Sequence, residues 1–161
     1  MEIRVIDFEE LTKSFIPYVE GYKEIESEKK RMIDSIDPDR KKMEAIIRRS
    51  QSGLVVDEFS QKRDMEEFKS IQEKLMRLDN EFKTKLKEMN NNLNSDIYDK
   101  LSVIVSNWAN KNSVDLVMGK MEVIFNTEDI DVTNKILDVL KEENLFYEET
   151  VVGYDIPTIN L

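Results

Sequence analysis

Apolar residues recur at every third or fourth position, without a break, between residues 65 and 108. Neither glycine nor proline interrupts the thirteen positions, which are Met65, Phe68, Ile71, Leu75, Leu78, Phe82, Leu86, Met89, Leu93, Ile97, Leu101, Ile104 and Trp108. The mean step is about 3.6 residues, the repeat of an α-helix. The pattern therefore predicts one helix roughly 65 Å long. An apolar stripe of that length needs a partner helix to bury it.

A second, less regular stripe precedes the first and can supply this partner. It consists of Leu11, Phe15, Tyr18, Tyr22, Ile25, Met32, Ile36, Met43 and Ile47. Pro17 is expected to interrupt or restart the helix, and Pro38 to kink or briefly break it, because proline lacks an amide hydrogen and clashes with the preceding turn.

The segment Gln51-Ser52-Gly53 is typical of a turn between the two stripes. Asp57 or Ser60 can cap the returning helix. We therefore expect an antiparallel helical hairpin, an arm, over residues 23–100, with its tip near residues 50–57.

Strand-like segments flank this helical region. Ile3 to Ile6 predict a short strand, and Asp7 a cap for a short helix over residues 8–15. Val114–Met118 and Met121–Phe125, separated by Gly119-Lys120, predict a β-hairpin.

The last part of the chain continues this mixed pattern. Asp131 is expected to cap a final helix, and the tail over residues 145–161 to add a strand or cover a sheet edge.

The expected fold class is α+β and mostly α. Residues 1–22 and 101–161 would form a small β/α body from which the arm projects. Three short strands leave exposed edges, and oligomerisation is the simplest way to close them. The side chains expected in this oligomerisation body are Ile3, Val5, Val114, Leu116, Val123 and Phe125.

The charge is unevenly distributed. The net charge is −10, and residues 114–161 hold three basic and eleven acidic side chains. Residues 40–49, by contrast, hold five Arg or Lys and one Glu. The acidic total argues against nucleic acid or an anionic membrane as a partner.

The residue types also argue against an enzyme. There is no Cys and no His, which removes thiolate catalysis and the commonest general base and transition-metal ligand. No glycine-rich phosphate loop or EF-hand spacing is present. We expect no catalytic residues, no cofactor and no metal site.

Targeting signals are not visible in the sequence. No apolar run approaches the roughly 18 residues of a membrane span, and no signal peptide precedes the first strand. We expect a cytoplasmic protein, or a periplasmic one if the sequence is a processed form.

Three segments together resemble the Skp/OmpH family of chaperones. They are Ile3-Arg4-Val5-Ile6-Asp7-Phe8-Glu9-Glu10-Leu11, then Val114-Asp115-Leu116-Val117-Met118, and finally Val123-Ile124-Phe125-Asn126 followed by Asp129-Ile130-Asp131-Val132-Thr133-Asn134-Lys135-Ile136-Leu137. The resemblance covers roughly residues 3–142. It implies a homotrimer with a small β body and three helical tentacles, which holds unfolded or assembling client proteins without ATP.

Residues near the expected tip are the candidates for binding such clients. Leu54, Val55 and Val56 are three consecutive apolar residues beside a turn, and Arg40, Arg48 and Arg49 belong to the basic run. The tip residues could instead pack against the arm, and the basic run could be a solvated face. The acidic, helix-rich chain also suits a scaffolding coiled coil that binds one defined partner. A prefoldin-like module fits less well, since its strands lie between the helices.

Overall fold

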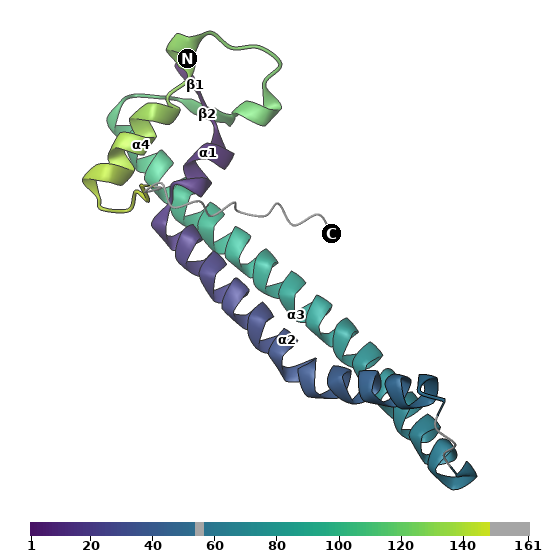
Figure 1. Ribbon diagram of the computed structural model, residues 1–161. Coiled ribbons are helices and arrows are strands. Elements are labelled where there is room, and N and C mark those ends of the chain that lie inside the picture. Colours follow the sequence, from purple (N-terminus) through teal and green to yellow (C-terminus); the bar gives the residue numbers. More distant parts are fainter. Residues whose placement is uncertain (54–56, 149–161) are drawn as a thin grey trace. The chain divides into compact units, whose positions relative to one another are not determined.

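The computed structural model describes residues 1–53 and 57–148 of the chain. In this part the elements are β1 (Ile3–Ile6), α1 (Phe8–Lys13), α2 (Ile16–Gln51), α3 (Glu58–Lys111), β2 (Leu116–Gly119), two short 3₁₀ turns (Lys120–Glu122 and Glu128–Ile130) and α4 (Thr133–Glu142) (Figure 1). The protein is mostly helical, as predicted.

The chain divides into two compact units. The first, which we call the body, contains residues 1–22 and 93–161, and the second, which we call the arm, contains residues 23–92. The sequence placed the second boundary near residue 101. The assignment of these regions to oligomerisation and client holding stays a prediction.

The long apolar stripe forms the buried face of α3, as predicted. Asp57 caps this helix, because its Oδ1 accepts a hydrogen bond of 2.9 Å from the Ser60 amide. Of the thirteen stripe positions only Met65, which is 69% exposed, is not at least partly buried. A regular 3.6-residue pattern was therefore sufficient to identify the helix.

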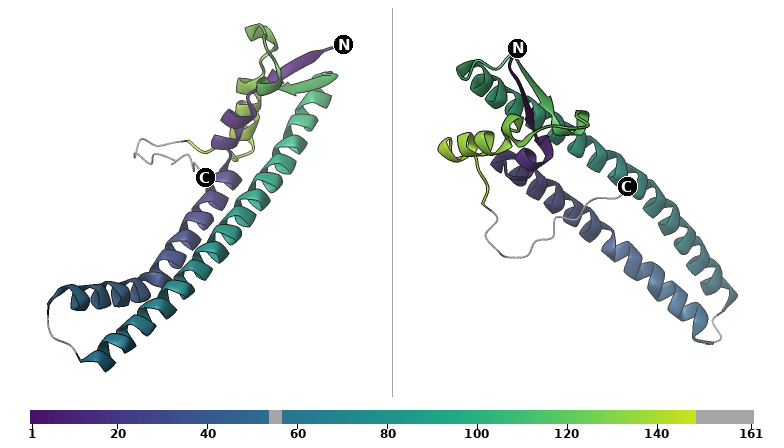
Figure 2. Two further views of the ribbon diagram at one scale, coloured as in Figure 1. Left: turned by 90° about the vertical axis from the view of Figure 1, so that its right-hand side faces the viewer. Right: turned by 90° about the horizontal axis from the view of Figure 1, so that it is seen from above.

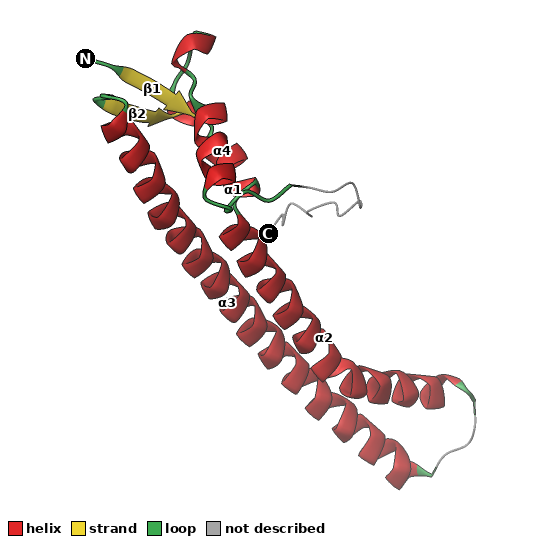
Figure 3. Ribbon diagram, turned by 90° about the vertical axis from the view of Figure 1, so that its left-hand side faces the viewer, coloured by secondary structure: helices red, strands yellow, loops and turns green. Residues whose placement is uncertain are grey.

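Helix α2 continues through Pro38 rather than breaking there. Its ribbon nevertheless bends along its length (Figure 3), which is the expected response to a proline inside a helix. The stripe also differs from the prediction near the end of α2, where Ile46 is buried and Ile47 is 39% exposed.

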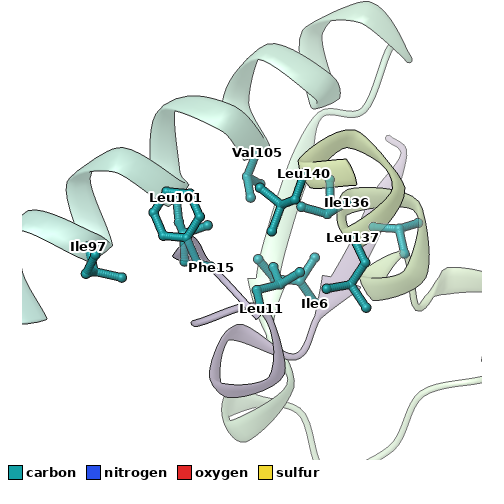
Figure 4. Close-up of a cluster of buried hydrophobic side chains, with 10 residues drawn as sticks. Ile6, Leu11, Phe15, Ile97, Leu101, Val105, Ile136, Leu137 and Leu140 are labelled. Atoms are coloured by element: carbon teal, nitrogen blue, oxygen red, sulfur yellow. The ribbon is translucent and has the colours of Figure 1, made fainter. Parts of the chain in front are cut away.

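The core of the body lies where β1, α1 and α4 pack against the part of α3 that follows residue 93 (Figures 2 and 4). Its buried members are Ile6, Leu11, Phe15, Ile97, Leu101, Val105, Val132, Ile136, Leu137 and Leu140. Gly21 lets α2 approach closely, since a Cβ at this position would lie 2.3 Å from Leu93 Cδ1.

The sheet differs from the predicted hairpin. β1 and β2 are parallel, with Ile3 opposite Leu116 and Ile6 opposite Gly119. The other side of β1 forms a single bridge from Val5 to Asp131. The second half of the predicted hairpin, Met121–Phe125, is not a strand.

The physical reason for this error is that strand propensity mainly reports packing against neighbours. Within the described chain, residues 121–125 have no strand beside them. The side chain of Met121 is 93% exposed and that of Phe125 is 80% exposed. The apolar pattern was real, but the described chain covers only Val123 in part and leaves Met121, Ile124 and Phe125 exposed.

Helix α4 ends in a Schellman motif that turns the chain back onto the body. Asn144 has a φ of 57°, and the amide of Leu145 donates to the carbonyl of Leu140 over 2.8 Å. Asp131, the predicted cap, accepts from the amide of Thr133 at 3.0 Å. The N-cap residue of α4 is, however, Val132 and not Asp131, so the prediction was wrong by one position.

Residues 145–147 then form a strap across the junction of α1 and α2. The Leu145 carbonyl accepts from the Ile16 amide at 2.9 Å, and the Tyr147 amide donates to the Ser14 carbonyl at 2.8 Å. The strap thus satisfies the first amide of α2, which has no partner inside the helix. The predicted strand in the tail is a single antiparallel bridge between Phe15 and Phe146, and residues 149–161 lie outside the described part.

In the arm, α2 and α3 lie side by side and are joined by three ion pairs. Glu28 pairs with Lys85 at 2.5 Å, Asp39 with Lys74 at 2.6 Å, and Arg49 with Asp64 at 2.9 Å. In each pair the two residue numbers add up to 113, so the partner on α3 has a lower number as the residue on α2 has a higher one. The three carboxylate side chains are 14–17% exposed, because the stems of their partners help to cover them.

Candidate functional site

The body exposes large apolar side chains on α3, on β2 and on the segment that follows β2. The group consists of Tyr98, Val103, Leu116, Met121, Ile124 and Phe125, which are 44–106% exposed. Three of them, Tyr98, Leu116 and Met121, line a groove of about 780 Å³ between α3 and residues 114–122. Large apolar side chains left in water are candidates for contact with a partner.

The six residues predicted for the oligomerisation body fall into three groups. Val5 is 1% exposed and packs inside the body itself. Ile3, Val114 and Val123 are partly buried, whereas Leu116 and Phe125 are exposed. Leu116 and Phe125 are therefore the two that present the most apolar surface to a partner.

The arm has a second apolar groove, near the end of α2 and the beginning of α3. The groove has a volume of about 460 Å³ and is lined by Ile46, Ile47, Arg49, Ser50, Gln61, Asp64, Met65 and Phe68. The exposed Met65 side chain belongs to it. This volume lies within the range of about 300–1,000 Å³ that is usual for ligand pockets.

An ion pair with two hydrogen bonds forms the polar part of this groove. Arg49 donates from Nε and Nη2 to the two carboxylate oxygens of Asp64, each over 2.9 Å. These hydrogen bonds hold the pKa of Asp64 below its ordinary value and raise that of Arg49. The charges of the groove lining are thus matched internally.

The predicted client-binding residues are only partly described. Leu54, Val55 and Val56 lie outside the described residues. Arg48 is exposed and lies 3.6 Å from Glu44, one helical turn before it. Arg40 is exposed and has no ion pair with another described residue.

Sequence reasoning missed the groove, although its residues were visible. Met65 and Phe68 were assigned to the buried stripe, and Arg49 to a basic run. The signal that could have revealed the groove is the apolar pair Ile46-Ile47, because adjacent helix positions cannot both face one partner helix. One of the two must point away from the seam.

The described residues contain neither a cluster of carboxylates able to hold a metal ion nor a helix long and apolar enough to cross a membrane. No curated protein matches this chain.

A family model for outer membrane protein (OmpH-like) matches residues 2–140. The match includes β1, both long helices, β2 and most of α4. This chain therefore belongs to the OmpH-like family, a family of chaperones that bind unfolded client proteins.

Proposed function

We propose that this protein is an ATP-independent holdase or assembly chaperone, which holds unfolded or assembling client proteins between helical arms. The observation that carries the proposal is that the arm keeps large apolar side chains in water. Phe59, Met65 and Met76 are each 64–78% exposed, although the core of the body is complete without them. Such a surface suits weak contacts with many different clients.

The arm is proposed to be an antiparallel hairpin. Support comes from its three ion pairs, because the residue number on α2 rises as the number on α3 falls: Glu28–Lys85, Asp39–Lys74 and Arg49–Asp64. Charged pairs at the edges of an apolar seam select orientation and register, as they do in coiled coils.

The body is proposed to assemble as a homotrimer. Support comes from the exposed apolar group on the body and from β2, whose only strand neighbour among the described residues is β1. An edge strand beside exposed apolar residues is a template for pairing with another chain. Association of copies would cover both features at once.

Two matched phenylalanine variants test the assembly. Phe125 in the body and Phe59 in the arm are almost equally exposed, at 80% and 78%. Phe125→Ser should dissociate the oligomer, because it removes apolar area from the proposed interface, and Phe59→Ser should leave it intact. Light scattering coupled to size exclusion measures the mass. A monomeric parent would contradict the trimer, and a trimeric mass for all three proteins would show that Phe125 is not essential to its interface.

The holdase activity is tested with heat-unfolded citrate synthase and no nucleotide. Suppression of its aggregation at a stoichiometric ratio supports the proposal, and ATP should not change it. Absence of suppression, together with saturable binding to one protein partner, would instead support the scaffolding alternative.

A further inference from the structure

We propose that the junction of α1 and α2 is a docking site for an extended peptide of a partner protein, and that the strap blocks this site. The strap, residues 145–147, follows α4 and is drawn in yellow in Figure 1. The peptide that fits would carry two adjacent large apolar residues and would add to the junction as a short β-strand. This inference goes beyond the proposed chaperone function and does not depend on it.

Two backbone hydrogen bonds hold the strap to the junction in the manner of an added β-strand. The amide of Ile16 donates to the carbonyl of Leu145 over 2.9 Å. The amide of Tyr147 donates to the carbonyl of Ser14 over 2.8 Å. Main-chain hydrogen bonds do not depend on the side chains of the added strand, so another extended segment can form them in place of the strap.

Side-chain packing supplies the selectivity of the site. Phe146 lies opposite Phe15 in an antiparallel bridge, and side chains that are opposite each other in such a bridge lie on the same face. Phe15 is 1% exposed and belongs to the core of the body, against which Leu145 and Phe146 pack. The ammonium group of Lys141 lies 4.9 Å from the centre of the Phe146 ring. The site therefore favours an aliphatic residue followed by an aromatic one.

The strap can leave its site while the core of the body stays closed. None of the ten buried core residues belongs to the strap, whose own side chains are only partly buried. Asn144, just before the strap, has a φ of 57°, a left-handed conformation that is unfavourable for a residue other than glycine. Segments with few buried contacts open at a lower free energy than the whole domain. A competing peptide can therefore displace the strap without unfolding the body.

The short connection to α4 makes the strap a strong competitor for this site. Only Glu143 and Asn144 separate the end of α4 from the strap. A segment tethered this closely has an effective concentration in the millimolar range, so a free peptide binds weakly until the strap is weakened. The family match covers residues 2–140, which include the junction but not the strap. The matched region thus carries the site, and the strap is an added element that blocks it.

The test uses a fluorescein-labelled peptide with the sequence of residues 143–148, Glu-Asn-Leu-Phe-Tyr-Glu, and variants of the whole chain. Phe146→Ser weakens the packing of the strap, whereas Phe59→Ser makes the same change at a 78% exposed position of the arm. Fluorescence anisotropy should show that Phe146→Ser binds the peptide about tenfold more tightly than the parent does. Equal binding by the parent and Phe146→Ser, or a loss of binding in Phe59→Ser, would overturn the proposal.

An N-methylated peptide tests the backbone contact. A methyl group on the tyrosine nitrogen removes the hydrogen that would be donated to the Ser14 carbonyl, and it should weaken binding to Phe146→Ser about fivefold to tenfold. The control is methylation of the phenylalanine nitrogen, because the Phe146 amide forms no backbone hydrogen bond with described residues. Equal binding of both methylated peptides would mean that apolar contact alone holds the peptide, and would overturn the proposal.

Hydrogen exchange of the parent chain, followed by NMR, keeps the proposal testable if Phe146→Ser does not fold. The unlabelled peptide at about 10 mM exceeds the effective concentration of the strap. It should accelerate exchange of the Tyr147 amide, whereas the Ile16 amide stays protected because the peptide supplies a carbonyl. An unchanged Tyr147 amide, or faster exchange of both amides, would overturn the shared site.

The same measurement on the parent without peptide tests whether the strap comes from the same chain. Protection of the Tyr147 amide should not depend on protein concentration. Protection that falls on dilution would mean that a second copy supplies the strap, and would overturn the assignment of the strap as a block within one chain.

Discussion

The body and the arm bury their apolar residues in different ways. In the body, Leu11 of α1, Leu101 of α3 and Leu140 of α4 converge and are each 0% exposed. In the arm, two helices can cover only one stripe, and few side chains, such as Ile25 and Ile71, are buried. A core built from several elements can bury its apolar side chains fully, whereas a pair of helices leaves some of them exposed to water.

Their charges differ as well. Residues 1–22 and 93–161 contain seven basic and eighteen acidic side chains, whereas residues 23–92 contain seventeen and sixteen. The arm uses its balanced charges in ion pairs across its seam. The body holds together despite its acidity because its core supplies the stability. The comparison indicates that packing dominates in the body, and that charged pairs specify alignment in the arm.

The largest expected effect tests this difference with two leucines of α3. Leu101→Ala should lower the free energy of unfolding by about 3–5 kcal/mol, because it leaves a cavity in a closed core. Leu78→Ala in the arm should cost about 1–2 kcal/mol, since this side chain is only partly buried. Urea denaturation measures both, and equal losses would remove the distinction between the two units.

Removing the strap should have the next largest effect, and it should act on the body. A chain that ends at Asn144 loses Leu145 and Phe146, which pack against the core, and two backbone hydrogen bonds to the junction of α1 and α2. We expect a loss of about 2–4 kcal/mol of stability and a lower melting temperature.

The control for this truncation is a chain that ends at Glu148, which keeps the strap. Its melting temperature should exceed that of the shorter chain by several degrees. If both truncations melt together, the strap contributes nothing to the stability of the body.

Acid should loosen the seam of the arm. Hydrogen bonds from Lys85 to Glu28 and from Arg49 to Asp64 hold the pKa of both carboxyl groups below their ordinary values. The pairs therefore stabilise the arm above the ordinary carboxyl pKa of about 4, and this contribution is lost as the pH falls through the lowered values. Hydrogen exchange of arm peptides, corrected for intrinsic rates, should accelerate over that interval.

The double variant Glu28→Gln with Asp64→Asn controls for other carboxyl groups. Its arm should exchange faster than that of the parent at neutral pH, and the two should converge in acid. An arm that responds to acid in the same way in both proteins would show that these pairs do not contribute.

The smallest expected effect comes from replacing serine by glycine at two positions, one just after α3 and one within it. Ser113 follows the helix with a φ of 57°, so Ser113→Gly should stabilise the protein by about 0.5–1 kcal/mol. Ser70 lies within the helix in the arm, and Ser70→Gly should destabilise it by roughly 0.5 kcal/mol. Thermal unfolding measures both, and changes of the same sign would contradict the backbone argument.

Local sequence patterns were sufficient for the helices and their caps. The stripe from Met65 to Trp108 predicted α3, and Asp7 and Asp57 cap their helices as expected. These features depend on residues within a few positions of one another, so the periodicity and side-chain chemistry of the sequence contain the information. The family resemblance likewise rested on short segments, and the match over residues 2–140 confirmed it.

Pairing between distant residues was decided only by the tertiary structure. The strand β2 pairs in parallel with β1, more than a hundred residues away, rather than with the adjacent apolar segment. The strap and the groove of the arm likewise depend on which surfaces meet, such as Leu145 with Ile16 and Met65 with Ile47. An apolar pattern predicts that a side chain is buried, but packing in three dimensions decides which residues bury it.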